Sequence, residues 1–131
     1  MITQEEIKQL EKKLGIKLDK FDQEQKTMIF LGVEADGLTV EQALIFAKPE
    51  YDMQKMMIVR LAFGWGFSNE QVKELAKANF TEKQKEQIWL GFRNDLKKEQ
   101  ILEYAKPEIT ADEMMIIREY YEIKNKREEN K

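Results

Sequence analysis

The sequence predicts an all-α protein built from tandem helical hairpins. Alignment of the chain on Phe21, Tyr51, Phe80 and Ile109 gives spacings of 30, 29 and 29 residues, and periods of this length are typical of repeat proteins. Within each period, apolar residues recur at helical spacing and helix-capping residues stand at two fixed places. About eight short helices are therefore expected, arranged as a short solenoid or as a more globular bundle.

The repeat divides the chain into one capping helix, three complete units and a half unit. A helix over residues 3–14, ended by Gly15, resembles the second helix of a unit and is expected to cap the N-terminal side. The units that follow cover residues 21–50, 51–79, 80–108 and 109–123. Residues 1–123 should thus form a single domain, and residues 124–131 are expected to be a charged tail.

Each unit contains a helix A and a helix B, whose starts are marked by side chains that accept hydrogen bonds from free backbone N–H groups. Helix A begins after Asp22, Asp52, Thr81 and Thr110. Helix B begins after Thr39, Ser68 and, in the third unit, Lys97. A Gln or Glu three residues after most of these caps predicts capping boxes, among them Gln25, Gln84 and Glu113.

The tetrapeptide Ala-Lys-Pro-Glu occurs twice, at residues 47–50 and 105–108, 58 residues apart. Its proline is expected to end helix B, because the residue before a proline avoids helical geometry. The second unit has Ala-Lys-Ala-Asn at the same place, without the proline. The duplicated tetrapeptide is therefore interpreted as a joint between units, which we call the seam, and not as a duplicated active site.

The remaining repeated columns predict the core. On helix B the columns that share one face are Ala43/Val72/Ile101, Phe46/Leu75/Tyr104 and Ala47/Ala76/Ala105. On helix A the corresponding columns are Ile29/Val59/Ile88/Ile117 and Val33/Phe63/Phe92/Tyr121, beside the small residues Gly32/Ala62/Gly91. Helix A has a second apolar side, so it should pack between neighbours.

Composition restricts the chemistry. The chain has no Cys and no His, which excludes thiolate and imidazole nucleophiles and the usual zinc ligand sets. No metal, cofactor or enzymatic activity is expected. The net charge of -3 comes from 22 basic and 25 acidic residues mixed along the chain, and no segment is apolar enough for a signal peptide or a membrane span. A cytoplasmic protein without membrane contact is predicted.

The repeated residues also resemble a known family. Met56 to Phe63, Ile88 to Phe92 and Tyr104 to Pro107 are similar to short helical repeats in proteins of phages, plasmids and other mobile elements of Firmicutes. The resemblance covers Phe21 to about Tyr121. It implies a mobile-element origin but no reaction, because the shared letters are core, cap and seam positions.

One stripe of helix A is left over by the predicted packing, and we call it the outer stripe. It contains aromatic, Met and Arg side chains, which are enriched at protein interfaces. Together with Trp65, which lies between two glycines in a turn, the predicted protein-binding residues are Phe30, Met53, Met57, Arg60, Trp65, Trp89, Arg93, Met115 and Arg118. Two alternatives stay open: the fold buries the stripe against the N-terminal helix, or a homodimer buries it.

The predicted function is non-catalytic binding to another protein. The mobile-element resemblance sharpens this hypothesis to an inhibitor of a host protein such as a defence nuclease of the CRISPR type. The alternative is a nucleic-acid-binding accessory or regulatory protein, which would use the small basic spots at Lys97-Lys98 and residues 124–127, near Arg93 and Trp89.

Overall fold

The computed structural model describes residues 1–130, which form eight α-helices and no strand. The predicted all-α class is confirmed. The helices are α1 (Gln4–Leu14), α2 (Gln23–Glu34), α3 (Val40–Phe46), α4 (Met53–Gly64), α5 (Asn69–Lys77), α6 (Glu82–Arg93), α7 (Lys98–Tyr104) and α8 (Ala111–Glu129).

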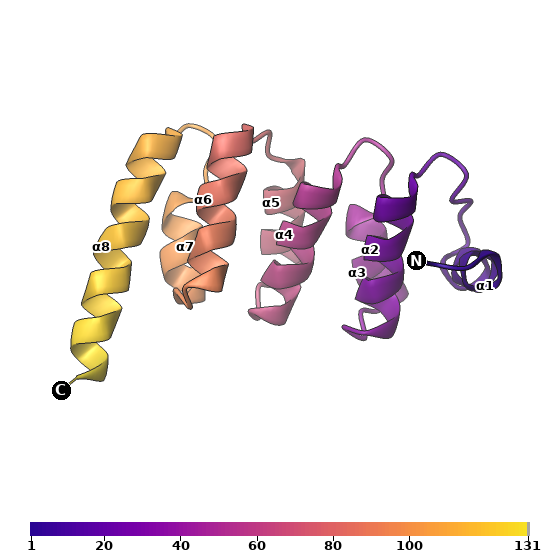
Figure 1. The fold of residues 1–131 in the computed structure, drawn as a ribbon, viewed down its shortest axis with the longest axis horizontal. Helices are drawn as coiled ribbons and strands as arrows, with labels where there is room; N and C mark the ends of the chain where they lie inside the picture. The colour runs from indigo at the N-terminus through magenta and orange to yellow at the C-terminus, as the bar shows by residue number, and fades with distance from the viewer. Residues whose placement is uncertain (131) are drawn as a thin grey trace.

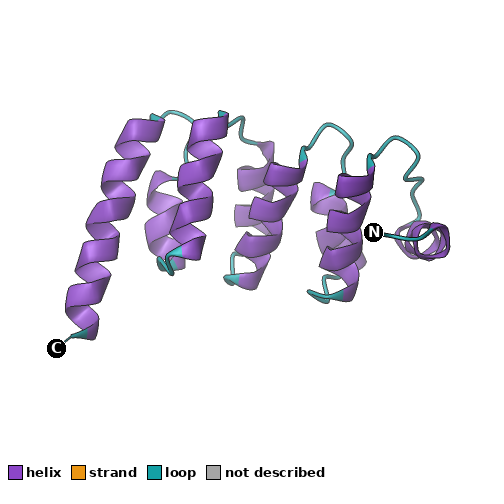
Figure 2. Cartoon of the chain, viewed as in Figure 1, coloured by secondary structure: helices purple, strands orange, loops and turns teal. Residues whose placement is uncertain are grey.

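The helical hairpins follow one another in chain order and form a bundle of two rows (Figures 1 and 2). The A helices α2, α4, α6 and α8 form one row, in which each helix packs on the next. The B helices α3, α5 and α7 lie behind them, and α1 crosses the N-terminal end against α2 and α3. The buried face of each row meets the other, so the core columns lie between the rows.

The helices begin where the capping pattern places them. Six of the eight helices have complete capping boxes, including those begun by Thr3, Asp22 and Thr110. The two exceptions are α4, where Lys55 stands in place of the reciprocal Gln or Glu after Asp52, and α7, where the Lys97 ammonium cannot accept a hydrogen bond. The Lys97 backbone N–H still donates to the Gln100 side chain at 2.9 Å, so half of the box survives.

A turn closed in the same way joins helix A to helix B in all three units, with one more residue in the first unit. A backbone N–H···O bond of 3.0 Å closes it each time, from Leu38 to Gly32, from Phe67 to Ala62 and from Leu96 to Gly91. One residue per turn has a positive φ, at Gly37, Gly66 and Asp95. Gly and Asp are among the residues that tolerate this conformation, so the closing bond and the positive φ are kept although the length and sequence of the turn change.

The small column of helix A is required by the close approach of helix B. A Cβ added to Gly91 would lie 2.1 Å from the Tyr104 hydroxyl oxygen. That hydroxyl is buried and donates to the Gln87 carbonyl at 2.7 Å, and burial raises the pKa of Tyr104. The tyrosine therefore fills the space that the glycine leaves.

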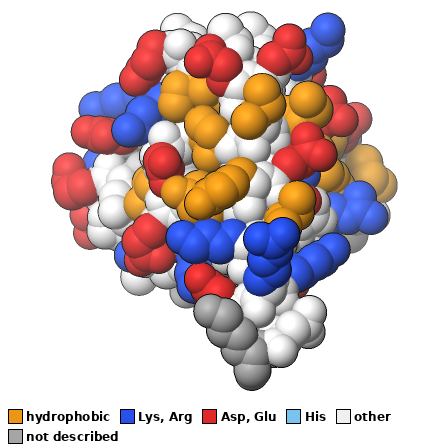
Figure 3. Space-filling view, turned by 90° about the vertical axis from the view of Figure 1, so that its left-hand side faces the viewer, with side chains coloured by type: hydrophobic (Ala, Val, Ile, Leu, Met, Phe, Trp, Pro, Cys, Tyr) orange, Lys and Arg blue, Asp and Glu red, His pale blue; other side chains and the backbone are white. Residues whose placement is uncertain are grey.

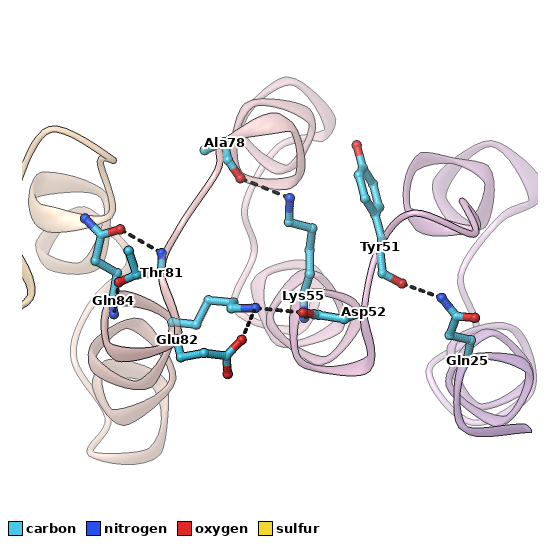
Figure 4. Close-up of polar contacts among 9 residues, drawn as sticks. Gln25, Tyr51, Asp52, Lys55, Ala78, Thr81, Glu82 and Gln84 are labelled. Atoms are coloured by element: carbon cyan, nitrogen blue, oxygen red, sulfur yellow. Dashed lines mark hydrogen bonds and ion pairs between the residues drawn. The ribbon is translucent and has the colours of Figure 1, made fainter. Parts of the chain in front are cut away.

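Each seam is held by a side chain near the start of helix A, which is buried in the first and third units. In the first unit, the Gln25 amide nitrogen donates to the carbonyl oxygens of Pro49 and Tyr51, at 2.9 and 2.6 Å. Its amide oxygen accepts from the Asp22 backbone N–H at 2.9 Å. One side chain thus caps its own helix and binds the seam between the first and second units; Figure 4 shows its bond to the Tyr51 carbonyl.

The third unit repeats this arrangement, whereas the second uses a different residue. Gln84 donates to the carbonyls of Pro107 and Ile109, at 3.0 and 2.7 Å. The corresponding position of the second unit holds Lys55, whose ammonium donates to the Ala78 carbonyl at 3.0 Å. Without the proline, α5 has nine residues where α3 and α7 have seven. The tetrapeptide therefore recurs with the glutamine that binds it.

The last helix is longer than the sequence indicated. A tail was expected from residue 124, but α8 continues to Glu129; Lys131 lies outside the described residues. Reciprocal hydrogen bonds of 2.9 and 3.0 Å between the Gln100 and Asn125 side chains hold the added turns to α7. A capping pattern does not reveal such contacts with another helix.

We expect the substitution Gln25→Ala to destabilise the protein by about 2–3 kcal/mol, because two seam carbonyls lose their donor and one cap is weakened. Chemical denaturation followed by circular dichroism measures this difference. Gln23→Ala is the matched control, since Gln23 is an exposed residue of the same helical turn, and it should change stability by less than about 0.5 kcal/mol. Equal effects of the two substitutions would contradict the role of Gln25.

Candidate protein-binding surface

Two neighbouring hollows lie along the outer side of the A-helix row. The first, of about 260 Å³, lies between α4 and α6, and the second, of about 370 Å³, lies at the C-terminal half of α4. Met57 contributes to both hollows. The predicted outer stripe therefore contains a continuous stretch of depressed surface on α4.

The first hollow has an apolar floor and a charged rim. Met57, Ile58 and Trp89 line it together with the polar Gln54. The charged residues around it are Glu82, Lys83, Lys85 and Glu86. Trp89 is half-buried, and the Arg93 guanidinium lies 5.2 Å from the centre of its ring. This stacking favours a defined orientation of the indole.

A buried lysine connects the rim to the start of α4. The ammonium of Lys85 lies 2.7 Å from Asp52 and 3.1 Å from Glu82; both carboxylates are labelled in Figure 4. Burial opposes the charge of Lys85, but the bonds to the two carboxylates outweigh burial and raise its pKa. Burial likewise opposes the charge of Asp52, whereas bonds from Lys85 and from the Lys55 backbone N–H lower its pKa overall. Both groups are therefore held in their charged forms.

The second hollow contains an ion pair between two units. The Arg60 guanidinium makes two bonds to the Asp36 carboxylate, at 2.7 and 3.0 Å. Leu61, Gly64 and Trp65 complete the lining. Arg60 was predicted as a binding residue, but its charge is already paired within the chain, so any contribution to binding would come from the exposed part of this pair.

Trp65 is folded onto the next unit. Its indole N–H donates to the Leu96 carbonyl at 2.8 Å, and its ring packs edge-on against Phe92 with centroids 5.4 Å apart. Both partners belong to the third unit. Trp65 therefore joins two consecutive turns, and only its remaining exposed edge lines the second hollow.

The other predicted residues differ in how far they are buried, and none of them lines either hollow. Arg118 is buried and bonds to the side chains of Gln87 and Glu122, which removes its guanidinium from the surface. Phe30 is partly buried against the core. Met53 and Met115 are exposed, but neither lines a hollow. The structure thus brings together Met57, Arg60, Trp65 and Trp89, with Arg93 stacked on Trp89.

Several residues of the site escaped sequence reasoning. Asp36, Ile58 and Glu86 line the hollows but are not among the predicted binding residues, because that prediction rests on aromatic, Met and Arg side chains. A search for opposite charges on neighbouring units would have suggested the pairing of Asp36 with Arg60.

The basic spots of the nucleic-acid alternative are partly engaged. The Lys97 ammonium lies 3.5 Å from Glu128, and that of Lys98 lies 3.4 Å from the Gly66 carbonyl. Within residues 1–130, no group of three or more acidic side chains is placed to hold a metal ion. None of the helices in this part of the chain is both long enough and apolar enough to cross a membrane.

Comparison with known proteins adds no relative. No family model matches the chain, and neither the curated proteins nor the solved structures give a significant match. The resemblance to repeats of mobile elements therefore stays a prediction that is based on the sequence pattern alone.

The Lys85 cluster predicts a specific pH dependence. Because the pKa of Asp52 is lowered by folding, its contribution is present above its unfolded pKa of about 3.9 and is lost as the pH falls through the folded value. Because the pKa of Lys85 is raised, its contribution is present below about pH 10.4 and is lost as the pH rises through the folded value. The stability of the wild type relative to Lys85→Met should therefore be highest between about pH 3.9 and about pH 10.4.

Urea denaturation from pH 3 to pH 11 measures this difference. We expect the wild type to lose on the order of 1 kcal/mol relative to Lys85→Met in the acid limb. Lys83→Met serves as the control, because Lys83 is an exposed neighbour on the same helix and its removal should give a difference from the wild type that is constant with pH. A stability difference between the wild type and Lys85→Met that does not change with pH would contradict the pairing of Lys85 with Asp52.

Proposed function

We propose that the protein is a non-catalytic binding module that uses the two hollows of the A-helix row to bind another protein. The observation that carries the proposal is the apolar floor formed by Met57 and Trp89 between charged rims. Aromatic and Met side chains in such a setting are typical anchors of protein interfaces. The repeat does not need these residues for its seams, caps or turns, so their presence on an outer surface calls for a separate explanation.

The surface indicates the chemistry of its partner. An apolar side chain of the partner would occupy the first hollow against Met57 and Trp89. Glu86 is exposed at the rim, and a positive charge next to the apolar anchor would complement it. The proposed ligand is therefore a protein segment that presents a large apolar residue flanked by Lys or Arg.

The mobile-element resemblance suggests the identity of the partner in the cell: a host protein, such as a defence nuclease, that the module inhibits by docking. This sharper form of the proposal is supported only by the resemblance of the repeat pattern. The binding surface itself requires only the apolar anchor and the flanking positive charge.

Selection from a random peptide display library tests the proposed chemistry directly. We expect selected peptides to share an apolar anchor next to Lys or Arg, and Trp89→Ala should weaken their binding at least tenfold, as for an interface anchor. The same variant should lose the partner that the wild type captures from a cell lysate. Circular dichroism confirms that the variant is folded.

The control is Val40→Glu, which changes an exposed apolar residue of the opposite row and should leave peptide binding intact. Peptides without a common anchor, or binding that Trp89→Ala does not affect, would contradict the proposal. Retention of polynucleotides with a steep loss between low and physiological salt would instead support nucleic-acid binding.

A further inference from the structure

The C-terminal end of the bundle exposes a helix face that is buried in the equivalent helix of the second unit. Ile58 of α4 and Ile116 of α8 are 58 residues apart and occupy the same position of the repeat. Ile58 is 4% exposed, in a row where α6 packs on α4, whereas Ile116 is 64% exposed. No helix follows α8 within the described residues, so this face has no partner among residues 1–130.

The exposed residues form a regular apolar strip. Ile116, Tyr120 and Ile123 are spaced by four and three residues, which places them on one side of α8. Their exposed fractions are 64%, 59% and 57%, among the largest of the apolar side chains. Figure 3, which looks at this end of the molecule, shows hydrophobic side chains gathered across the middle of the face. Large apolar residues clustered in this way mark an interaction surface.

The strip is not shaped for one more unit of the same repeat. Tyr120 stands in the small column of helix A, where the other units have Gly32, Ala62 and Gly91. At Gly91 even a Cβ would approach the Tyr104 hydroxyl to 2.1 Å. A following helix B could not pack against a tyrosine at this position, so the occupant must approach in a different way.

The charges beside the strip indicate how it approaches. On the same side of α8, Asp112 and Glu113 lie before the strip, and Lys124 and Arg127 lie at and beyond its end. Figure 3 shows acidic side chains above the apolar middle and basic ones below it. A second α8 packed antiparallel would place the acidic end of each helix against the basic end of the other.

This arrangement is self-complementary. In an antiparallel pair centred near Tyr120, Ile116 of one copy faces Ile123 of the other, and Asp112 of each faces the other's Arg127. Twofold interfaces of this kind use the same patch on both subunits and are the commonest form of homo-oligomer. We propose that the protein forms a twofold homodimer through the exposed face of α8. The A-helix hollows lie outside this interface, so the dimer would present two binding surfaces.

Sedimentation equilibrium on the full chain tests the proposal. We expect the wild type to approach twice its monomer mass of 15.6 kDa at concentrations up to about 100 µM, because a single-helix interface is small and its affinity modest. Ile116→Glu should raise the dissociation constant at least about 100-fold, since a twofold interface contains the change twice. Val40→Glu, the same kind of change on α3, should leave the dimer intact.

A charge exchange tests the antiparallel orientation. Arg127→Glu should weaken the dimer, and the double variant Asp112→Lys with Arg127→Glu should restore it, because each reversed end again faces an opposite charge. A wild type that is monomeric at every concentration overturns the proposal and would indicate that the α8 face binds a different protein. A dimer that Ile116→Glu does not weaken, or that the exchange does not restore, also overturns it. Peptide binding to the A-helix hollows is measured separately, so failure of one proposal leaves the other standing.

Discussion

The architecture depends on the side chain three residues after the cap of α2, α4 and α6, which bonds each of these helices to the seam at the end of its own unit. Gln25 does this by satisfying a cap N–H and two seam carbonyls at once. A carbonyl left without a donor in this position would cost about 1–3 kcal/mol. The same contact sets where the next helix starts, so an error at one seam would shift the following unit. Glutamine in the first and third units alternates with Lys55 in the second, which matches the spacing of 58 residues between the two Ala-Lys-Pro-Glu tetrapeptides.

Because the polar groups at the seams bond to each other within the chain, the outer side of the A-helix row is not needed to satisfy them. Polar groups that are needed for the fold are bonded within or between adjacent units, as for Lys85 with Asp52 and for Arg60 with Asp36. The outer side of the A-helix row can then carry Met57 and Trp89 without loss to the fold. Equivalent positions of the repeat have different roles because their neighbours differ. Ile58 is buried because α6 packs on α4, whereas Ile116 is exposed on α8, after which no helix follows within residues 1–130.

The sequence was sufficient to predict the helices, because caps, prolines and apolar spacing are local signals. The turns and the core columns followed from the same pattern. The burial and contacts of the predicted binding residues could not be predicted, because Trp65 and Arg118 bond to residues of a neighbouring unit. Those contacts depend on the angle between units, which a repeat period does not reveal. The continuation of α8 past residue 123 depends likewise on Gln100 of another helix.

Hydrogen exchange at the two seams of Gln84→Ala tests the role of the glutamines most directly. The Ile109 N–H bonds to the Lys106 carbonyl in the third-unit seam, and the Tyr51 N–H bonds to the Lys48 carbonyl in the first. If glutamine holds each seam, exchange at Ile109 should become faster while Tyr51 keeps its wild-type rate. An unchanged rate at Ile109, or an equal acceleration at both seams, would contradict the proposed role.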